Sequence, residues 1–356
     1  MSNYKYYPLI KTRDAELRCF AHLDPSLLDE ILPIYELTKS RTTKKVPDGD
    51  IYRRMKQIHE IQGERPFILD LSTDERYINP QIKQLLSERN GFLDWQYFIL
   101  DIHGSMNIIP MIHLYEDDEG NFVEVESFVK TVSKVRQKLA VRLPHDLDEE
   151  DIEYYLSPVF NSLHEEAKVI IVFDAGYIRD AAKVSIEDIV NNFVASCRSV
   201  QGFNDKIDDV VIISTSFPSS VATEGGEDAE GDFEIYEEKV FMAVSDEVDD
   251  VKYGDYASIN TEQIEMKGGT FVPRIDIASQ DGNSFFYKRF RRNDGSYPRC
   301  AKAVIDDHRY KNLNSWADDE ISLASNGDPS GISPSYWISV RMNYYIMTRF
   351  NLRASG

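Results

Sequence analysis

The chain has 356 residues, 42% hydrophobic residues and a formal net charge of −21, which argues against non-specific binding to duplex DNA or anionic lipid. No apolar run approaches the roughly 18–20 residues that cross a bilayer, and the N-terminus lacks the order of a signal peptide. Three distant cysteines form neither a disulfide framework nor a CxxC metal site, so we expect a cytoplasmic protein with no membrane contact.

Eight short apolar runs, each ending in a polar residue, predict parallel strands. The clearest is Lys168–Gly176, in which five apolar residues rich in β-branched side chains stop at Asp174. In chain order the others are Tyr7–Lys11, Leu32–Glu36, Pro66–Asp70, Ile109–His113, Leu139–Arg142, Val210–Ser214 and Val251–Asp255. This series predicts an α/β fold: a (β/α)8 TIM-barrel-like single domain whose polar face lies at the strand ends.

Helical patterns separate these strands near residues 14–23, 50–61, 81–89, 125–137, 148–164, 185–199 and 233–244. Residues 91–104 are apolar but too irregular to assign. The stretch Ser219–Glu238 is rich in glycine and acidic residues, which predicts a solvated, mobile loop; a functional lid is the alternative.

The last hundred residues exceed what a barrel needs. Phe271–Ile277 and Ser284–Phe290 flank turn-forming residues and predict a β-hairpin, followed by helices near 296–308 and 336–349. We expect a barrel core over residues 1–260, with residues 261–356 packed on it as an extension of the same domain. The hairpin would overhang the mouth of the barrel, where Arg289 and Arg291 suit phosphates; alternatively, it only balances an acidic body.

Strand alternation predicts one ring of ionisable side chains around the mouth. The candidate catalytic residues are Lys11, Glu36, Asp70, His113, Asp174 and Asp255. The candidate ligands for Mg²⁺ or Mn²⁺ are Glu36, Asp70, Asp174 and Asp255, and the candidate anion-binding residues are Lys11, Arg142, Arg289 and Arg291. No HExxH, Walker or GxSxG pattern supports a named mechanism, and the alternative is a neutralised charge network in which His113 is a satisfied rim histidine.

Several segments resemble the "beta protein" family first named from T4-type phage. They are Tyr7–Leu17, Ile31–Glu36, the strand ending at Asp70, Tyr253–Tyr256 and Trp337-x3-Arg341-x-Asn343. The resemblance implies a phage–host conflict setting and marks Lys11, Glu36, Asp70 and Asp255 as motif positions, but it supplies no mechanism or cofactor. Tyr344 and Tyr345 stand where the family has histidines, so no role of those histidines is carried over.

Two functions follow as hypotheses. The first is a metal-dependent hydrolase or transferase acting on a nucleotide or nucleic-acid phosphate. The second is a non-catalytic component that binds a protein partner in a defence or counter-defence assembly, with its working residues on the Ser219–Glu238 loop and the C-terminal third.

Overall fold

Eight parallel strands close into a barrel in the order β1-β2-β3-β4-β5-β6-β7-β9, which confirms the predicted fold. The structure is a computed structural model that describes residues 4–226, 229–261 and 271–354. The barrel strands are β1 (Tyr7–Lys11), β2 (Ile34–Leu37), β3 (Phe67–Leu71), β4 (Ile108–Ile112), β5 (Lys138–Pro144), β6 (Lys168–Tyr177), β7 (Ile207–Thr215) and β9 (Val251–Asp255). Each predicted strand corresponds to one of these.

The two faces of the barrel strands contribute to different apolar cores. Inward-facing residues fill the barrel interior and include Leu9, Ile34, Ile68, Met111, Ala140, Ile170, Val172, Val211 and Ile213. The outward-facing residues pack against the surrounding helices in a larger core. Because alternate residues share a face, each inward apolar column continues to a side chain at the carboxyl-terminal mouth.

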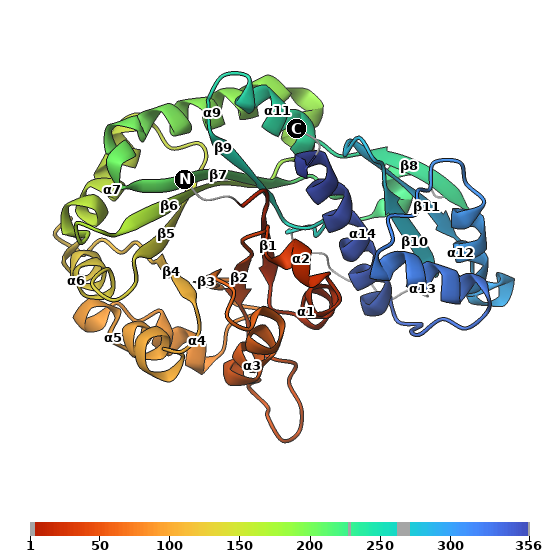
Figure 1. Ribbon diagram of the computed structural model, residues 1–356, viewed down its shortest axis with the longest axis horizontal. Helices are drawn as coiled ribbons and strands as arrows, with labels where there is room; N and C mark the ends of the chain where they lie inside the picture. The colour runs from red at the N-terminus through yellow and green to blue at the C-terminus, as the bar shows by residue number, and fades with distance from the viewer. Residues whose placement is uncertain (1–3, 227–228, 262–270, 355–356) are drawn as a thin grey trace.

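Helices cover the outside of this barrel (Figure 1). Their starts often follow capping residues, and Asp50, Asn79, Asp148 and Ser185 each accept a backbone N–H of the helix that follows. The helices are α1 (Asp14–Ala21), α2 (Pro25–Leu28), α3 (Ile51–Gln62), α4 (Pro80–Leu85), α5 (Arg89–Tyr97), the π-helical turn η1 (Phe98–Ile102), α6 (Val123–Val132), α7 (Glu149–Ser162), α8 (Arg179–Val184), α9 (Ile186–Ser199), η2 (Gln201–Lys206) and α11 (Glu237–Ser245). The stretch that the sequence left unassigned forms α5 and η1, and no described helix has the length and apolar content of a membrane span.

A second, smaller group of elements lies beside the barrel, and we call it the side unit (Figure 1). Its antiparallel sheet has the order β10-β11-β8, with β8 (Glu230–Glu234), β10 (Arg274–Ala278) and β11 (Ser284–Arg289). The other elements are α10 (Val221–Glu224), η3 (Arg292–Asp294), α12 (Ser296–Ile305) and α13 (Trp316–Ser325), and together they enclose an apolar core of their own.

The side unit confirms the predicted hairpin and corrects the prediction for Ser219–Glu238. That stretch, apart from residues 227 and 228, which lie outside the described residues, contains α10 and β8 rather than only a solvated loop. Strand β8 forms because β11 offers it an edge, with Phe285 paired to Phe233. Residues 233 and 234 therefore belong to a strand, and the helix predicted from residue 233 begins at Glu237.

The long final helix, α14 (Pro334–Ala354), belongs to both parts of the molecule. Met342 and Ile346 lie in the core around the barrel, whereas Trp337 and Tyr345 lie in the core of the side unit. The helix packs along α1 and forms ion pairs with α11, so it completes the helical layer after the eighth barrel strand. It is therefore the last helix of the barrel and not only an appendage.

A candidate functional site at the mouth of the barrel

Three predicted site residues stand side by side at the carboxyl ends of neighbouring strands. The strand register pairs Lys11 with Glu36 and Glu36 with Asp70. The Lys11 Nζ lies 3.2 Å from Glu36 Oε1, and the side chains of Glu36 and Asp70 are nearly buried. The strand register therefore fixes one cation and two acids in a row.

Arg142 crosses the mouth from β5 and joins these acids to a third one on β6. Its Nη2 lies 3.1 Å from Asp70 Oδ2, and its Nη1 lies 3.6 Å from Glu36 Oε2 and 3.8 Å from Asp174 Oδ2. The Arg142 side chain remains 23% exposed, so a ligand entering the mouth can reach it. One guanidinium group thus faces three carboxylates, and it cannot give all of them close, well-aligned contacts at once.

Tyr256 is a member of this site that the sequence analysis missed. Its hydroxyl donates a hydrogen bond of 2.5 Å to Asp174 Oδ2, and the Gly176 N–H donates one of 2.7 Å to Asp174 Oδ1. The side chain belongs to the interior core of the barrel and follows β9 directly. Burial, and then the nearby Asp174 carboxylate, raise the pKa of Tyr256 well above its usual value, so it stays protonated and able to donate.

The acids of the mouth differ in the direction of their pKa shifts. Burial raises the pKa of both Asp70 and Asp174, and the opposing charge of Arg142 offsets this only in part. Burial acts the same way on Glu36, but Arg142 and Lys11 outweigh it and leave its pKa below the usual value. One carboxyl group is therefore held ionised, while two others accept protons more readily than ordinary aspartates.

His113 follows β4 and lines a cleft of about 320 Å³ that Asp70 and Arg142 also border. Its ring packs near Phe92 and Trp95, and its Nε2 is a buried atom with no hydrogen-bond partner among the described residues. Burial, and then the charge of Arg142, lower the pKa of His113 to about 4, so the imidazole is neutral near pH 7. The structure thus places His113 next to the charged side chains of Asp70 and Arg142.

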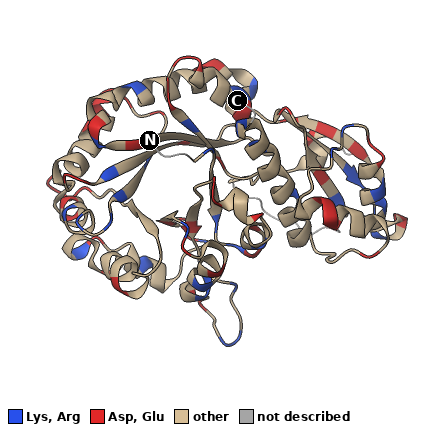
Figure 2. Ribbon diagram, viewed as in Figure 1, with Lys and Arg blue, Asp and Glu red and all other residues tan. Residues whose placement is uncertain are grey.

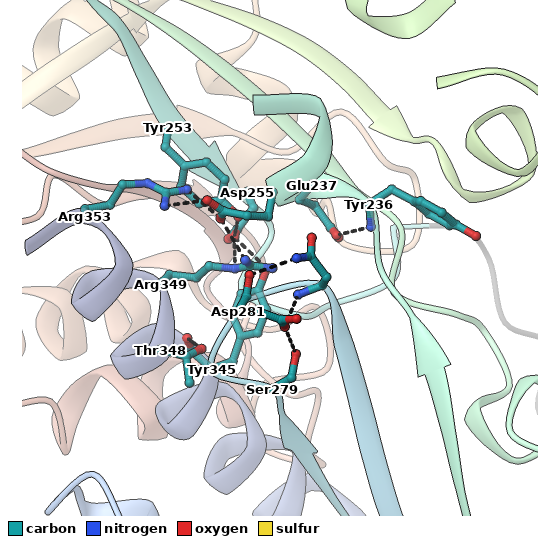
Figure 3. A network of polar contacts seen from close by, with 12 residues as sticks. Tyr236, Glu237, Tyr253, Asp255, Ser279, Asp281, Tyr345, Thr348, Arg349 and Arg353 are labelled. Atoms are coloured by element: carbon teal, nitrogen blue, oxygen red, sulfur yellow. Dashed lines mark hydrogen bonds and ion pairs between the residues drawn. The ribbon is translucent and has the colours of Figure 1, made fainter. Parts of the chain in front are cut away.

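Asp255 does not join the mouth, contrary to the predicted ring. Its side chain lies on the outer face of β9, where the hydroxyls of Tyr253 and Tyr345 donate to it and Arg349 Nε lies 3.7 Å away (Figure 3). The hydroxyl of Tyr6 also donates to it. The inward position on this strand is occupied by Gly254, because a Cβ there would lie 2.4 Å from the Ile213 side chain. Asp255 therefore forms part of a buried network that joins the barrel to α14.

Two other predictions concern the arginines of the hairpin and the candidate metal ligands. Arg289 ends β11 and Arg291 follows it, so both belong to the side unit, which lies beside the ring of strands rather than over its centre (Figure 1). Within residues 4–226, 229–261 and 271–354, no group of three or more His, Cys, Asp and Glu side chains is placed to hold a metal ion. The mouth acids Asp70 and Asp174 contact Arg142, and Asp255 faces away from them.

Comparisons with known proteins agree with the resemblance seen in the sequence. "Protein beta" of Enterobacteria phage P4 is 28% identical over 355 residues, covering 98% of this chain and 94% of the phage protein. The phage is P4, whereas the sequence resemblance pointed to T4-type phage. A solved structure, xylanase B from Clostridium stercorarium F9, covers 70% of this chain and 85% of its own at 10% identity, but its TM-score of 0.28 supports no argument. Residues 6–350 match the family described as "Beta protein", and the chain belongs to this beta protein family.

Proposed function

We propose that the mouth of the barrel binds a phosphate-bearing substrate and acts on it by acid–base catalysis, as a hydrolase or transferase on a nucleotide or nucleic-acid phosphate. The supporting observation is that three carboxyl groups around Arg142 have pKa values shifted in opposite directions. The pKa of Glu36 is lowered, and those of Asp70 and Asp174 are raised. Carboxyl groups that are pushed apart in this way are suited to separate acid and base roles.

The roles follow from charge and position. Lys11 and Arg142 attract the anionic group of the substrate, and Glu36, held ionised, removes a proton from the attacking water or hydroxyl group. The attacking oxygen forms a bond to phosphorus as the bond to the leaving oxygen breaks. In its protonated form, which burial favours, Asp174 gives a proton to that leaving oxygen, and Tyr256 positions it through their hydrogen bond.

The test is an activity assay on the full chain with a panel of nucleotides and nucleic-acid ends, with products separated by chromatography. We expect Asp70→Asn/Asp174→Asn to lose at least about a hundred-fold in rate, because it removes the proposed general acid, Asp174. The matched control, Asp246→Asn/Asp249→Asn, changes two exposed aspartates and should keep the rate. Equal rates in the two double variants would refute the proposal.

The same activity assay, repeated with and without divalent cations, tests the predicted metal ion separately. The steps above use only side chains of the protein, including the acids that contact Arg142. Mg²⁺ or Mn²⁺ remains a prediction, and it is supported if either ion raises both the rate and the melting temperature, because a ligand that binds only the folded state stabilises it. An equal rate in EDTA would contradict it.

A second candidate function, binding to a protein partner, is favoured by a different surface. An open groove of about 460 Å³ between α6 and α7 is lined by Glu126, Glu150 and Glu153 with the aromatic rings of Phe122 and Tyr154, and its lining contains no lysine or arginine. Such a groove suits a basic segment of another protein.

Charge removal in this groove separates the two functions. If binding is the function, Glu150→Gln/Glu153→Gln should release a stoichiometric partner that co-purifies with the wild-type protein, while the mouth variant retains it. Glu165→Gln/Glu166→Gln, two exposed acids after α7, is the matched control. If the control variant also releases the partner, the effect is one of general charge, and the proposal that the groove binds the partner is contradicted.

We also propose that the biological setting is phage–host conflict, in defence or counter-defence. The family relationship to a phage protein supports this setting. Phage plating on a host that expresses the wild-type chain should differ from plating on a host that expresses Asp70→Asn/Asp174→Asn. Equal plating on both hosts and on a host without the chain would contradict the setting.

A further inference from the structure

A cavity of about 390 Å³ lies beside the mouth, between the segments that follow β1, β2 and β3 and the start of α14. The cationic residues in its lining are Arg13, Lys39, Arg41 and Arg54, and the acidic ones are Asp14 and Glu16. Burial raises the pKa of Glu16, which weakens the negative charge there. The cavity is therefore cationic in a protein whose formal net charge is −21.

Two of the four cations in this cavity lack an acidic partner among the described residues, and Arg13 Nε lies as far as 4.0 Å from Glu16 Oε1. Lys39 and Arg41 form no ion pair with any acid among the described residues, although the chain has 61 aspartates and glutamates. Arg54 is only 3% exposed, and although its Nη1 contacts Asp14 at 2.8 Å, its buried Nε has no hydrogen-bond partner in the described structure. A buried donor without a partner is costly, and an anion in the cavity would compensate for it.

Tyr77 connects the cavity to the mouth. Lys11 Nζ, which belongs to the mouth, lies 4.8 Å from the centre of the Tyr77 ring, and Arg13 Cζ lies 5.3 Å from the same centre. The Lys39 N–H donates a 2.8 Å hydrogen bond to the Tyr77 carbonyl, which holds the β2 and β3 loops together. Cations of the mouth and of the cavity therefore flank a single ring, and a short chain of linked phosphates can bridge them.

We propose that this cavity is a second anion site and that the ligand of the mouth is a small molecule with two or more linked phosphates, of the nucleoside polyphosphate class. The inference rests on the proposed phosphate chemistry at the mouth. A small ligand is favoured over a nucleic-acid strand because acidic residues are spread over the helices of the barrel and over the side unit (Figure 2). A longer polyanion leaving the cavity would meet this repulsive field.

The test is isothermal titration calorimetry on the full chain with inorganic phosphate, tripolyphosphate and ATP, in EDTA and at constant ionic strength. We expect tripolyphosphate and ATP to bind at least about ten-fold more tightly than phosphate. Lys39→Gln/Arg41→Gln should abolish that preference. Lys44→Gln/Lys45→Gln removes the same charge from the same loop outside the cavity lining and should preserve it.

The outcomes separate the cavity from the mouth. The proposal that the cavity binds an anion would be overturned if the two lysine-containing double variants had the same preference for tripolyphosphate over phosphate. It would also be overturned if the wild-type chain did not bind tripolyphosphate. Tighter binding of a short single-stranded oligonucleotide than of ATP would overturn the small-molecule class. If Lys11→Gln leaves the affinity for tripolyphosphate unchanged while Lys39→Gln/Arg41→Gln abolishes it, the cavity is supported as an anion site. The proposal that the mouth binds phosphate is then contradicted.

Discussion

Arg142→Gln removes the guanidinium group that faces three carboxylates, and its effect on stability can be worked out from the structure. Breaking a buried ion pair on one side costs about 3–5 kcal/mol, and the 23% exposure of Arg142 lowers this to about 3 kcal/mol near pH 7.5. Without Arg142, the pKa values of Glu36, Asp70 and Asp174 in the folded state all rise. A carboxyl group whose folded pKa exceeds its unfolded value of about 4 destabilises the fold as pH rises above that value.

The loss should therefore be largest near pH 7.5 and shrink to about 1 kcal/mol near pH 4.5, where the acids take up protons. Urea unfolding at both pH values measures it. Arg198→Gln is the control, because its 2.9 Å pair with Glu247 is half-exposed and should contribute less than about 1 kcal/mol at either pH. The reasoning is refuted if Arg142→Gln costs no more than the control, or if its cost does not depend on pH.

Three other predictions test separate features by urea unfolding. A pKa of about 4 keeps His113 neutral in the folded protein, so the free energy of unfolding falls as pH drops from about 6.5 towards 4. His113→Gln should reduce this fall by about 2 kcal/mol near pH 5. An unchanged pH dependence of stability would contradict this prediction. Arg349→Met should cost about 3–5 kcal/mol and exceed the cost of Arg353→Met, because Arg349 is fully buried and Arg353 is not; the reverse order would contradict the network. Gly254→Ala should cost about 1–3 kcal/mol because the added methyl meets the Ile213 side chain, and a neutral result would contradict a tightly packed interior.

The barrel could be predicted from the sequence because its strands are buried on both faces. Strand β6 shows this most clearly, since Val169 to Phe173 are all buried and the apolar run ends at Asp174. Such a strand carries its own signal and does not depend on knowledge of its partners. The same property placed Lys11, Glu36 and Asp70 at or next to the last residues of their strands, and Asp174 where the apolar run of β6 stops.

Features that depend on non-local partners could not be predicted in this way. Strand β8 consists of one buried phenylalanine, Phe233, among three acids and a glycine, and it exists only because β11 lies next to it. Asp255 faces outward because Gly254 takes the crowded interior position, and the same alternation turns Tyr256 back towards the mouth. The small residue Gly254 was the signal that could have identified both.

The sheet order β10-β11-β8 has a consequence for how the chain matures on the ribosome. Synthesis completes the eighth barrel strand at Asp255, when β8 has already been made but its partner β11 has not. At translation rates of about 5–20 residues per second, β8 waits several seconds for Ser284 to Arg289 to emerge. Throughout that interval Phe233 lacks its cross-strand partner, and the backbone groups of β8 are unpaired. A chain released from the ribosome just after the barrel closes would therefore expose a strand edge that can pair with other chains and aggregate.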